Sequence, residues 1–292
     1  MYHCIVNPVA GRGNGRKMLS AINTFMRDNG KEIGIKETRY PLDASQFAKE
    51  ACANGSQGII GIGGDGTIQE IVTGMLNNTD KCSVPLYMIS CGSGNDWQRS
   101  FKQNNSIKSC LSSLIEDKTQ TIDAIWVNGM ACLNIANIGI DARIVRNAQR
   151  FKKFFGKNAY VISAIISILS HKNTSITVYI EDTQKMKGSF TLVAACNGQY
   201  YGGGMRIAPS AIIDDGQITL CLVNAMGRLK AFTLFPLVLF GKHTSLPAVR
   251  YIKCNKVTFV PEGSQTLCLD GNLYEFNDSL KFKILPGAIQ IV

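Results

Sequence analysis

The chain has 292 residues, of which 45% are hydrophobic and 18% are charged, and its formal net charge is +10. This composition predicts a globular protein with a sizeable core, in one large or two ordinary domains. No apolar run is long enough to span a bilayer and no leader peptide is recognisable, so we expect a cytoplasmic protein, and the positive charge indicates an anionic partner.

The first predicted element is a strand at Tyr2–Val6, followed by a glycine-containing loop at residues 7–13 and a helix at residues 16–29. A loop of this kind between a strand and a helix can contact a phosphate group, because backbone N–H groups are free at the start of a helix. A plain turn between a strand and a helix would have the same pattern.

A second strand is predicted at residues 33–40, ending near Thr38. Asp43 is expected to cap a helix that runs to about Ala53, because a carboxylate before a helix can accept its free N–H groups.

Residues 58–72 are the most informative stretch: they predict a buried strand, a glycine turn and the start of a helix. Gly63, Gly64 and Gly66 are expected to allow a backbone conformation that side chains would forbid. Such a turn directs N–H groups and the positive end of a helix at an anion, which indicates a phosphate site. Asp65 would repel phosphate unless a metal ion bridges the two or the carboxylate handles a proton.

Thr67 and Glu70 have the spacing of a capping box, so Thr67 is predicted to be the N-cap of the helix. The next strand is expected at residues 84–90, and a further glycine turn follows at residues 92–96.

Strands and helices alternate over roughly the first 120 residues, which predicts an open, mostly parallel sheet flanked by helices. Ligands of such sheets bind at the carboxyl ends of the strands. The loops at residues 7–13, near Thr38, at residues 63–67 and at residues 92–96 all lie at such ends, so we expect them to form one site.

The pattern changes after about residue 120. Residues 121–127 and 130–137 predict a hairpin with an Asn128-Gly129 turn, and residues 141–155 and 158–171 predict helices. Short strands are predicted at residues 174–181, 189–197, 217–223, 256–260, 266–269 and 280–284. We therefore expect an α/β domain at 1–120 and a β-rich sandwich domain at 121–292, with the active-site cleft between them, and the last few residues can return to the first domain.

The chain has ten cysteines, none of them in a C-x-x-C pair, and several lie in apolar runs. Small buried thiols are therefore expected rather than disulfides or a zinc site. No basic–aromatic recognition motif is present, which makes nucleic acid the weakest anionic partner.

Glycine and aspartate recur together in the second domain. A glycine-rich loop spans residues 197–209, Asp214-Asp215-Gly216 follows it, and Asp270-Gly271-Asn272 lies near the end. Pairs of Asp and Gly usually form turns, but a carboxylate beside free carbonyl groups can also hold Mg²⁺.

Together these motifs resemble those of the soluble bacterial-type lipid kinases in the diacylglycerol kinase catalytic-domain family. The resemblance covers nearly the whole chain and follows the family's order: Asn7-Pro8-x-x-Gly11, Gly63-Gly64-Asp65-Gly66-Thr67, Gly92-Ser93-Gly94-Asn95-Asp96, Asn134-Ile135 with Gly139-Ile140-Asp141-Ala142, and Tyr201-Gly202-Gly203-Gly204 with Asp214-Asp215-Gly216. Sphingosine kinases and NAD kinases share the second motif, and the last pair favours the lipid kinases.

The resemblance implies that ATP binds in the cleft and that a lipid hydroxyl accepts the phosphate. Ser93 and Gln69 stand where the family usually has Thr and Asn. A structural Mg²⁺ would use the Asp215 carboxylate and the carbonyl groups of Ile212 and Gln217. The implied nucleotide-binding residues are Asn7, Gly11, Arg12, Thr38, Gly63, Gly64, Asp65, Gly66, Thr67, Ile68, Gln69 and Ser93.

One departure concerns the proton acceptor. The family's Asp-Gly-Glu is Asp270-Gly271-Asn272 in this chain, and an amide cannot take a proton at neutral pH. Asp270 can serve as the base, Asp65 is a second candidate, and Glu275 is close in sequence.

The leading hypothesis is an ATP- and Mg²⁺-dependent lipid kinase that phosphorylates diacylglycerol to phosphatidic acid. The alternatives are an NAD kinase, and a nucleotide- and lipid-binding homologue whose catalysis is weak or lost because of Asn272. A homodimer is expected only from the resemblance.

A lipid kinase without a membrane span must reach the bilayer surface. Residues 143–157 combine six basic residues with three phenylalanines and no acid, so they predict a helix that contacts anionic lipid at the inner face of the membrane. A solvated surface helix would have the same composition. The apolar residues at 232–240 could line a slot for an acyl chain, although core packing is the commoner role of such residues.

Overall fold

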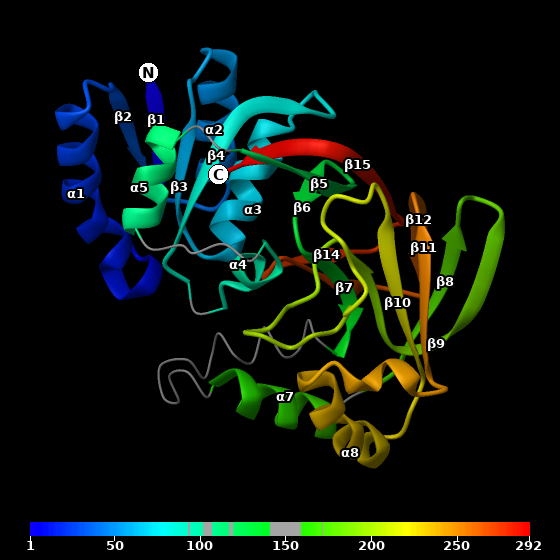
Figure 1. The fold of residues 1–292 in the computed structure, drawn as a ribbon. Coiled ribbons are helices and arrows are strands. Elements are labelled where there is room, and N and C mark those ends of the chain that lie inside the picture. Colours follow the sequence, from blue (N-terminus) through cyan, green and yellow to red (C-terminus); the bar gives the residue numbers. More distant parts are fainter. Residues whose placement is uncertain (93, 102–106, 117–118, 141–158, 171) are drawn as a thin grey trace.

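The computed structural model describes residues 1–292 except 93, 102–106, 117–118, 141–158 and 171 (Figure 1). Ser93, the predicted helix at 141–155 and the basic run at 143–157 therefore lie outside the described residues, wholly or almost wholly.

The N-terminal part contains four parallel strands in the order β2–β1–β3–β4. Their bounds are β1 Tyr2–Val6, β2 Ile33–Glu37, β3 Ile59–Gly63 and β4 Cys82–Ser90. The helices are α1 Asn14–Asp28, α2 Asp43–Ala53, α3 Asp65–Met75, α4 Asp96–Phe101 and α5 Ile107–Glu116, with a short 3₁₀ turn, η1, at Ala10–Gly13. The predicted open, mostly parallel sheet is confirmed.

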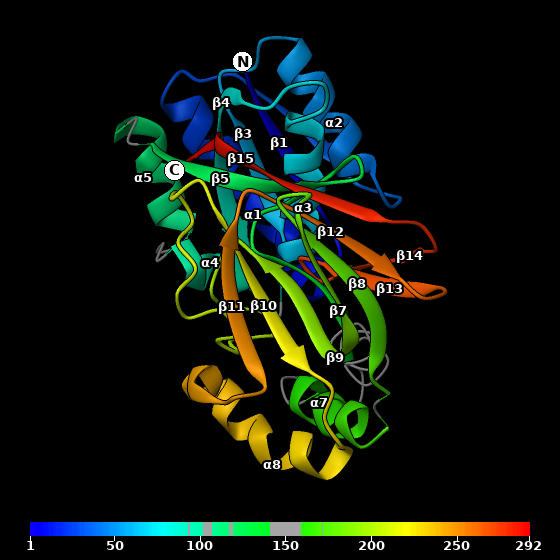
Figure 2. The same ribbon diagram turned by 90° about the vertical axis from the view of Figure 1, so that its right-hand side faces the viewer.

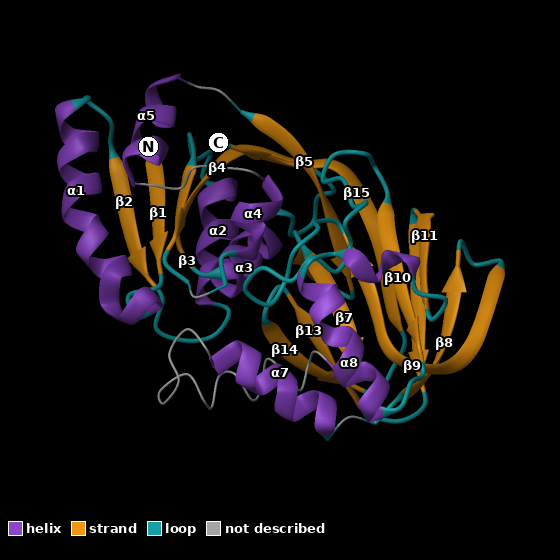
Figure 3. Cartoon of the chain, turned by 60° about the horizontal axis from the view of Figure 1, so that its bottom comes forward, coloured by secondary structure: helices purple, strands orange, loops and turns teal. Residues whose placement is uncertain are grey.

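Both faces of this sheet are covered. Ile5 and Ile59 pack in one core with residues of α2 and α3, whereas Val6 and Ile60 pack in a second core with residues of α1 and α5. Figure 3 shows α1 and α5 on one side of the strands and α2, α3 and α4 on the other. Burial on both faces explains why the strands are apolar without alternation.

The two helix caps expected from the sequence are wrong. The helix α3 begins at Asp65, its N-cap is Gly64, and Thr67 lies inside its first turn. Glu70 accepts the N–H of Leu42 at 3.1 Å, so it serves the start of the neighbouring helix α2. Asp43 is the first residue of α2, and its carboxylate accepts the N–H groups of Arg39 and Tyr40 in the preceding turn.

The C-terminal part is β-rich, and the predicted sandwich domain is confirmed. Its strands are β5 Gln120–Val127, β6 Met130–Cys132, β7 Ile135–Gly139, β8 Thr174–Ile180, β9 Gln184–Cys196, β10 Ile218–Asn224, β11 Val249–Cys254, β12 Lys256–Pro261, β13 Gln265–Leu269, β14 Asn272–Phe276 and β15 Leu280–Ile291. The described helices are α7 Ala159–Leu169, α8 Arg228–Leu239 and a 3₁₀ turn, η3, at Lys242–Ser245.

Three expectations for this part need correction. Residues 130–137 form two strands instead of one, because the chain breaks between β6 and β7. Residues 228–239 form the helix α8, although Pro236 lies inside it. The strands β11 and β14 were not predicted, because neither has the apolar alternation of a half-buried strand.

The strand β15 joins the two parts of the molecule. It pairs antiparallel with β12 and β5, and its last residues pair parallel with β4 through Ile289 and Ile291. Figure 2 shows β15 running from the N-terminal strands toward the C-terminal strands. One continuous hydrogen-bonded sheet therefore passes through both parts.

The helices α7 and α8 lie side by side at the end of the molecule farthest from β1 and β2 (Figures 1 and 2). Within the described part of the chain, neither these nor any other helix is long and apolar enough to cross a membrane.

Candidate active site

The turn between β3 and α3 needs glycine for space and not for an unusual backbone. None of its three glycines has a left-handed φ angle. A Cβ atom on Gly63 would lie 2.4 Å from the Cβ of Thr67, and one on Gly64 would lie 3.1 Å from the Cα of Gly92. A Cβ on Gly66 would lie 2.5 Å from Oδ1 of Asn272. The expectation of a forbidden backbone conformation is therefore wrong, and close approach replaces it.

The loop after β1 lies beside this turn. Nδ2 of Asn7 donates to Oγ1 of Thr67 at 3.2 Å. Gly11 and Arg12 have φ angles of 59° and 61°, and a Cβ on Gly11 would lie 2.6 Å from the carbonyl oxygen of Cys91. The structure thus brings these predicted nucleotide residues to the edge where β1, β3 and β4 end.

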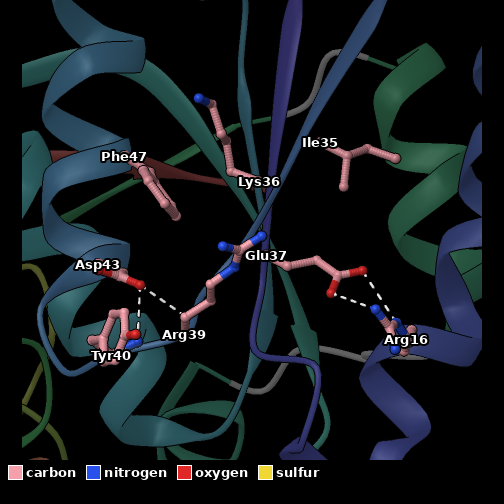
Figure 4. A pocket seen from close by; sticks show the side chains of 8 residues that line it. All are labelled: Arg16, Ile35, Lys36, Glu37, Arg39, Tyr40, Asp43 and Phe47. Carbon is pink, nitrogen blue, oxygen red and sulfur yellow. Dashed lines mark hydrogen bonds and ion pairs between the residues drawn. The ribbon is translucent and has the colours of Figure 1, made fainter.

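Thr38 lies one strand farther out, and its N–H donates to the carbonyl of Val6 at 2.9 Å. Beside it is an open hollow of about 610 Å³ between α1 and α2. Figure 4 shows the side chains that line this hollow; Arg16 forms an ion pair with Glu37 at 2.9 Å, and Lys36 lies over the ring of Phe47. The complete lining is Arg16, Ile35, Lys36, Glu37, Arg39, Tyr40, Asp43 and Phe47.

Asp65 uses both carboxylate oxygens to hold the start of α4. They accept the N–H groups of Asn95 at 2.8 Å, Asp96 at 2.7 Å and Trp97 at 3.3 Å. Burial raises the pKa of Asp65, and these three N–H groups oppose that rise. This carboxylate therefore fixes the turn at 92–96 against the glycine turn at 63–67.

Asp96 is a buried carboxylate that belongs to the Gly92–Asp96 motif but was not predicted to be a site residue. It accepts the N–H of Gly203 at 2.8 Å and forms an ion pair with Arg99 at 3.0 Å. Burial and the neighbouring Asp65 carboxylate raise the pKa of Asp96 to about 7. Its position at the end of a glycine turn that follows a strand is the feature of the sequence that could have indicated a functional role.

Asp270 organises the break between β6 and β7. Its oxygens accept the N–H groups of Leu133 at 2.7 Å, Asn134 at 3.1 Å and Ile135 at 2.9 Å, and the Cys132 thiol lies 3.3 Å away. Burial raises the pKa of Asp270 to about 6, although the backbone donors oppose this shift. Both predicted bases thus have their oxygens engaged by backbone donors.

The other residues of the Asp270 hairpin face two directions. Nδ2 of Asn272 donates to the carbonyl of Gly66 at 3.2 Å and to Oε1 of Gln69 at 2.9 Å. Glu275 is exposed and accepts a hydrogen bond from Thr266 within the hairpin at 3.0 Å. The structure therefore brings Asn272 to the glycine turn and leaves Glu275 outside it.

Of the predicted Mg²⁺ ligands, the Asp215 carboxylate is already engaged by a cation and a backbone donor in the arrangement present. Oδ2 of Asp215 is 2.6 Å from the ammonium group of Lys253, and Oδ1 accepts the N–H of Gln217 at 3.0 Å. The ammonium already neutralises this carboxylate, and a divalent cation beside it would be repelled. Across the described residues, no three His, Cys, Asp or Glu side chains are grouped to hold a metal.

An apolar cavity of about 80 Å³ lies beneath α7 and α8. The helix α8 contributes four residues to its wall, β9 and β10 contribute three, and Tyr201 of the glycine-rich loop also lines it. Of the 232–240 stretch, Leu234, Phe235 and Val238 line it, whereas Phe232 and Phe240 are exposed.

Comparison with known proteins gives a consistent result over the whole chain. Residues 1–127 match the family model of the diacylglycerol kinase catalytic domain, and residues 134–292 match that of the YegS C-terminal NAD kinase beta sandwich-like domain. The second match covers more than half of the 292 residues.

Two relatives and one solved structure illustrate the similarity. The chain is 28% identical over 284 residues to the "Probable lipid kinase YegS-like" of Shewanella frigidimarina, with 91% of this chain and 86% of the relative covered. It is 24% identical over 299 residues to the diacylglycerol kinase of Mycobacterium tuberculosis, with 99% and 93% covered. A crystal structure from Bacillus anthracis has the same fold, with a TM-score of 0.81 at 22% identity, covering 100% of this chain and 96% of that one.

Proposed function

This chain belongs to the family of diacylglycerol kinases and YegS-like lipid kinases, and from that premise we propose that it transfers the γ-phosphate of MgATP to a lipid hydroxyl. Diacylglycerol is the acceptor that we propose, and phosphatidic acid is then the product. Mg²⁺ enters with the nucleotide as part of the MgATP substrate, where it supplies neutralisation of phosphate charge.

The observation that carries this proposal is the glycine turn at the N-terminus of α3. Three positions there lack room for a Cβ, and Asn7 and Thr67 meet beside them. A helix N-terminus of this kind binds phosphate through backbone N–H groups and the helix dipole. We propose that the phosphates of ATP lie against residues 63–67, as the sequence motif predicts.

The nucleoside half of ATP has a candidate place in the hollow next to Thr38. Tyr40 lines this hollow and is 74% exposed, so it offers an aromatic face against which a base can stack. The hollow lies at the free edge of β2, which is the outermost strand on this side of the sheet.

The lipid has a candidate place at the α7–α8 end. The cavity beneath these helices is apolar, and its volume of about 80 Å³ has room for only the end of an acyl chain. On the outer surface, Leu229 is 79% exposed and Phe240 is 72% exposed. No acidic residue occurs between Gly216 and Pro261, whereas Arg228, Lys230 and Lys242 are all exposed. We propose that this surface touches anionic lipid, in addition to the basic run at 143–157.

The chemistry demanded of the protein is mainly positioning. Phosphoryl transfer passes through a loose transition state, so orientation and charge neutralisation dominate over proton abstraction. Asp65 holds the turn at 92–96, and Asp270 holds the break before β7. We propose that the two carboxylates orient the two substrates by holding these segments in place.

The test is transfer of γ-³²P from MgATP in mixed micelles to diacylglycerol, monoacylglycerol, phosphatidylglycerol or sphingosine, with NAD as a further acceptor. We expect label on diacylglycerol, reduced in Asp65→Asn and kept in Asn277→Asp, which alters an exposed residue. Label only on NAD would contradict the proposal and show that the protein is an NAD kinase. ATP binding without label on any acceptor would replace it with the inactive homologue.

A further inference from the structure

Two residues that depart from the family pattern meet in space, although 203 positions separate them. Gln69 lies on α3, and Asn272 is the first residue of β14. Nδ2 of Asn272 donates to Oε1 of Gln69 at 2.9 Å, and the hydroxyl of Tyr274 donates to the same oxygen at 3.2 Å. The side chains of residues 69 and 272, where the family usually has Asn and Glu, therefore form one cluster.

The orientation of the Gln69 amide is fixed by its other partners. Its Nε2 donates to the carbonyl of Ala131 at 2.9 Å and to Oγ1 of Thr73 at 3.0 Å. A carbonyl can only accept, so the nitrogen must face Ala131 and the oxygen must face Asn272. Gln69 is 1% exposed, and water cannot replace these partners without opening the contact.

Residue 272 is thereby required to donate. Both groups opposite its side chain, the carbonyl of Gly66 and Oε1 of Gln69, are acceptors. An ionised carboxylate has no proton to offer either of them. The Tyr274 hydroxyl would still donate to Oε1 of Gln69, but a negative charge at residue 272 would face two oxygen acceptors in a partly buried site, which is unfavourable.

We propose that Asn272 is a positioning residue whose amide clasps the β13–β14 hairpin to the first turn of α3, and that a carboxylate at 272 cannot fill this role while Gln69 is present. The side chains of residues 69 and 272 therefore act as one coupled pair. Its meaning for catalysis rests on the proposed kinase function, whereas the clasp itself does not.

The clasp connects the two halves of the candidate site. The hairpin carries Asp270, which organises the start of β7, and α3 carries the glycine turn. Oδ1 of Asn272 leaves no room for a Cβ at residue 66. The clasp therefore sets the distance between the phosphate-binding turn and the β-rich part.

The first test uses Asn272→Asp, which keeps the shape and removes the donor, with Asn277→Asp as the matched control at an exposed position of the same region. Thermal unfolding without any substrate is measured from about pH 4 to pH 8. We expect Asn272→Asp to have a lower Tm than wild type at pH 8. The deficit should vanish near pH 4, where a protonated Asp can again donate.

The two acceptors and the partial burial favour the protonated form of the introduced carboxyl group in the folded state, so its pKa is higher there than in the unfolded state. The deficit is therefore absent below the unfolded-state pKa and grows as pH rises through the folded-state pKa. A Tm equal to that of wild type at pH 8, or a deficit that does not change with pH, would overturn the clasp.

The second test compares Asn272→Glu with the double variant Gln69→Asn/Asn272→Glu. We expect the single variant to lose about tenfold or more in kcat with a smaller change in KM for ATP, because the turn is misplaced. The double variant should recover Tm and a substantial part of kcat. Equal or greater loss in the double variant contradicts the coupling. Absence of lipid kinase activity in wild type would contradict the proposed function. The comparison of Tm between wild type and Asn272→Asp would then still decide whether the clasp exists.

Discussion

Three aspartates at the junction of the two parts share an unusual use of their charge. Each accepts hydrogen bonds from backbone N–H groups: Asp65 from the start of a helix, Asp96 from a loop and Asp270 from the start of a strand. The electrostatic proximity of Asp65 contributes to the raised pKa of the other two. These carboxylates hold backbone segments in place, and their pKa values therefore depend on the folded structure.

This arrangement predicts a pH dependence of stability. The pKa of Asp96 is raised to about 7 and that of Asp270 to about 6 by burial, so the folded state binds more protons than the unfolded state above about pH 4. The free energy of unfolding should therefore fall as pH rises from about 4 to about 7. Asp96→Asn should remove part of this fall, on the order of a kcal/mol, in urea titrations at several pH values. An unchanged slope would contradict the prediction.

The ion pair between Asp215 and Lys253 gives a second residue-scale prediction. In the absence of nucleotide, the Tm of wild type should be equal in Mg²⁺ and in chelator, because the ammonium occupies the carboxylate. Lys253→Met should gain a Mg²⁺-dependent rise in Tm through binding to the freed group. Lys253→Arg is the charge-conserving control. A saturable rise in wild type that Asp215→Asn abolishes would show instead that Mg²⁺ displaces Lys253.

At the scale of elements, the glycine turn and the β13–β14 hairpin constrain each other. Gly66→Ala adds a Cβ that meets Asn272, although alanine suits a helix better than glycine. We expect a loss of about 1–3 kcal/mol in the free energy of unfolding from this overpacking.

Two comparisons isolate the cause of that loss. Gly34→Ala, on β2, places the new Cβ 3.7 Å or more from its neighbours, which is ordinary contact, and should be nearly neutral. Gly66→Ala combined with Asn272→Ala removes the clashing group and should cost less than the sum of the two single variants. Additive losses would show that the clash is not with Asn272.

The helix α8 carries the element-scale prediction about membranes. Replacing the exposed Leu229 and Phe240 by Ser should weaken sedimentation with anionic vesicles several-fold, because less apolar surface enters the interface. Val260→Ser, which alters an exposed position on β12, is the control and should bind as wild type. Equal sedimentation of all three proteins would exclude α8 as the contact.

At the scale of the whole molecule, β15 and β5 make the two parts one hydrogen-bonded unit. We therefore expect a single cooperative unfolding transition. The two tryptophans report on it separately: Trp97 is buried on α4, and Trp126 lies on β5. Each single variant, Trp97→Phe or Trp126→Phe, keeps one tryptophan as the reporter. In each variant, the Tm from the fluorescence of that tryptophan should equal the Tm from circular dichroism of the same protein. Two separate transitions would show that the parts unfold independently.

Local patterns in the sequence were sufficient for much of the fold. The isoleucine run of β3, its bounding glycines and the spacing to the next apolar residues predicted a strand, a turn and a helix, because neighbours in sequence determine such elements. The helix α8 was not predicted because its sequence contains a proline, and β14 was not predicted because it lacks the apolar alternation of a half-buried strand.

The site divides in the same way. Composition and local motif were enough to predict a glycine turn before a helix, an α/β part and a β-rich part, since these depend on periodicity and on residues within a few positions of each other. Only the tertiary structure decided that Asn272 pairs with Gln69, that Lys253 neutralises Asp215, and that Asp270 holds the chain break before β7. These contacts join segments far apart in the sequence, and hydrogen-bond geometry between them is set by how the sheets pack.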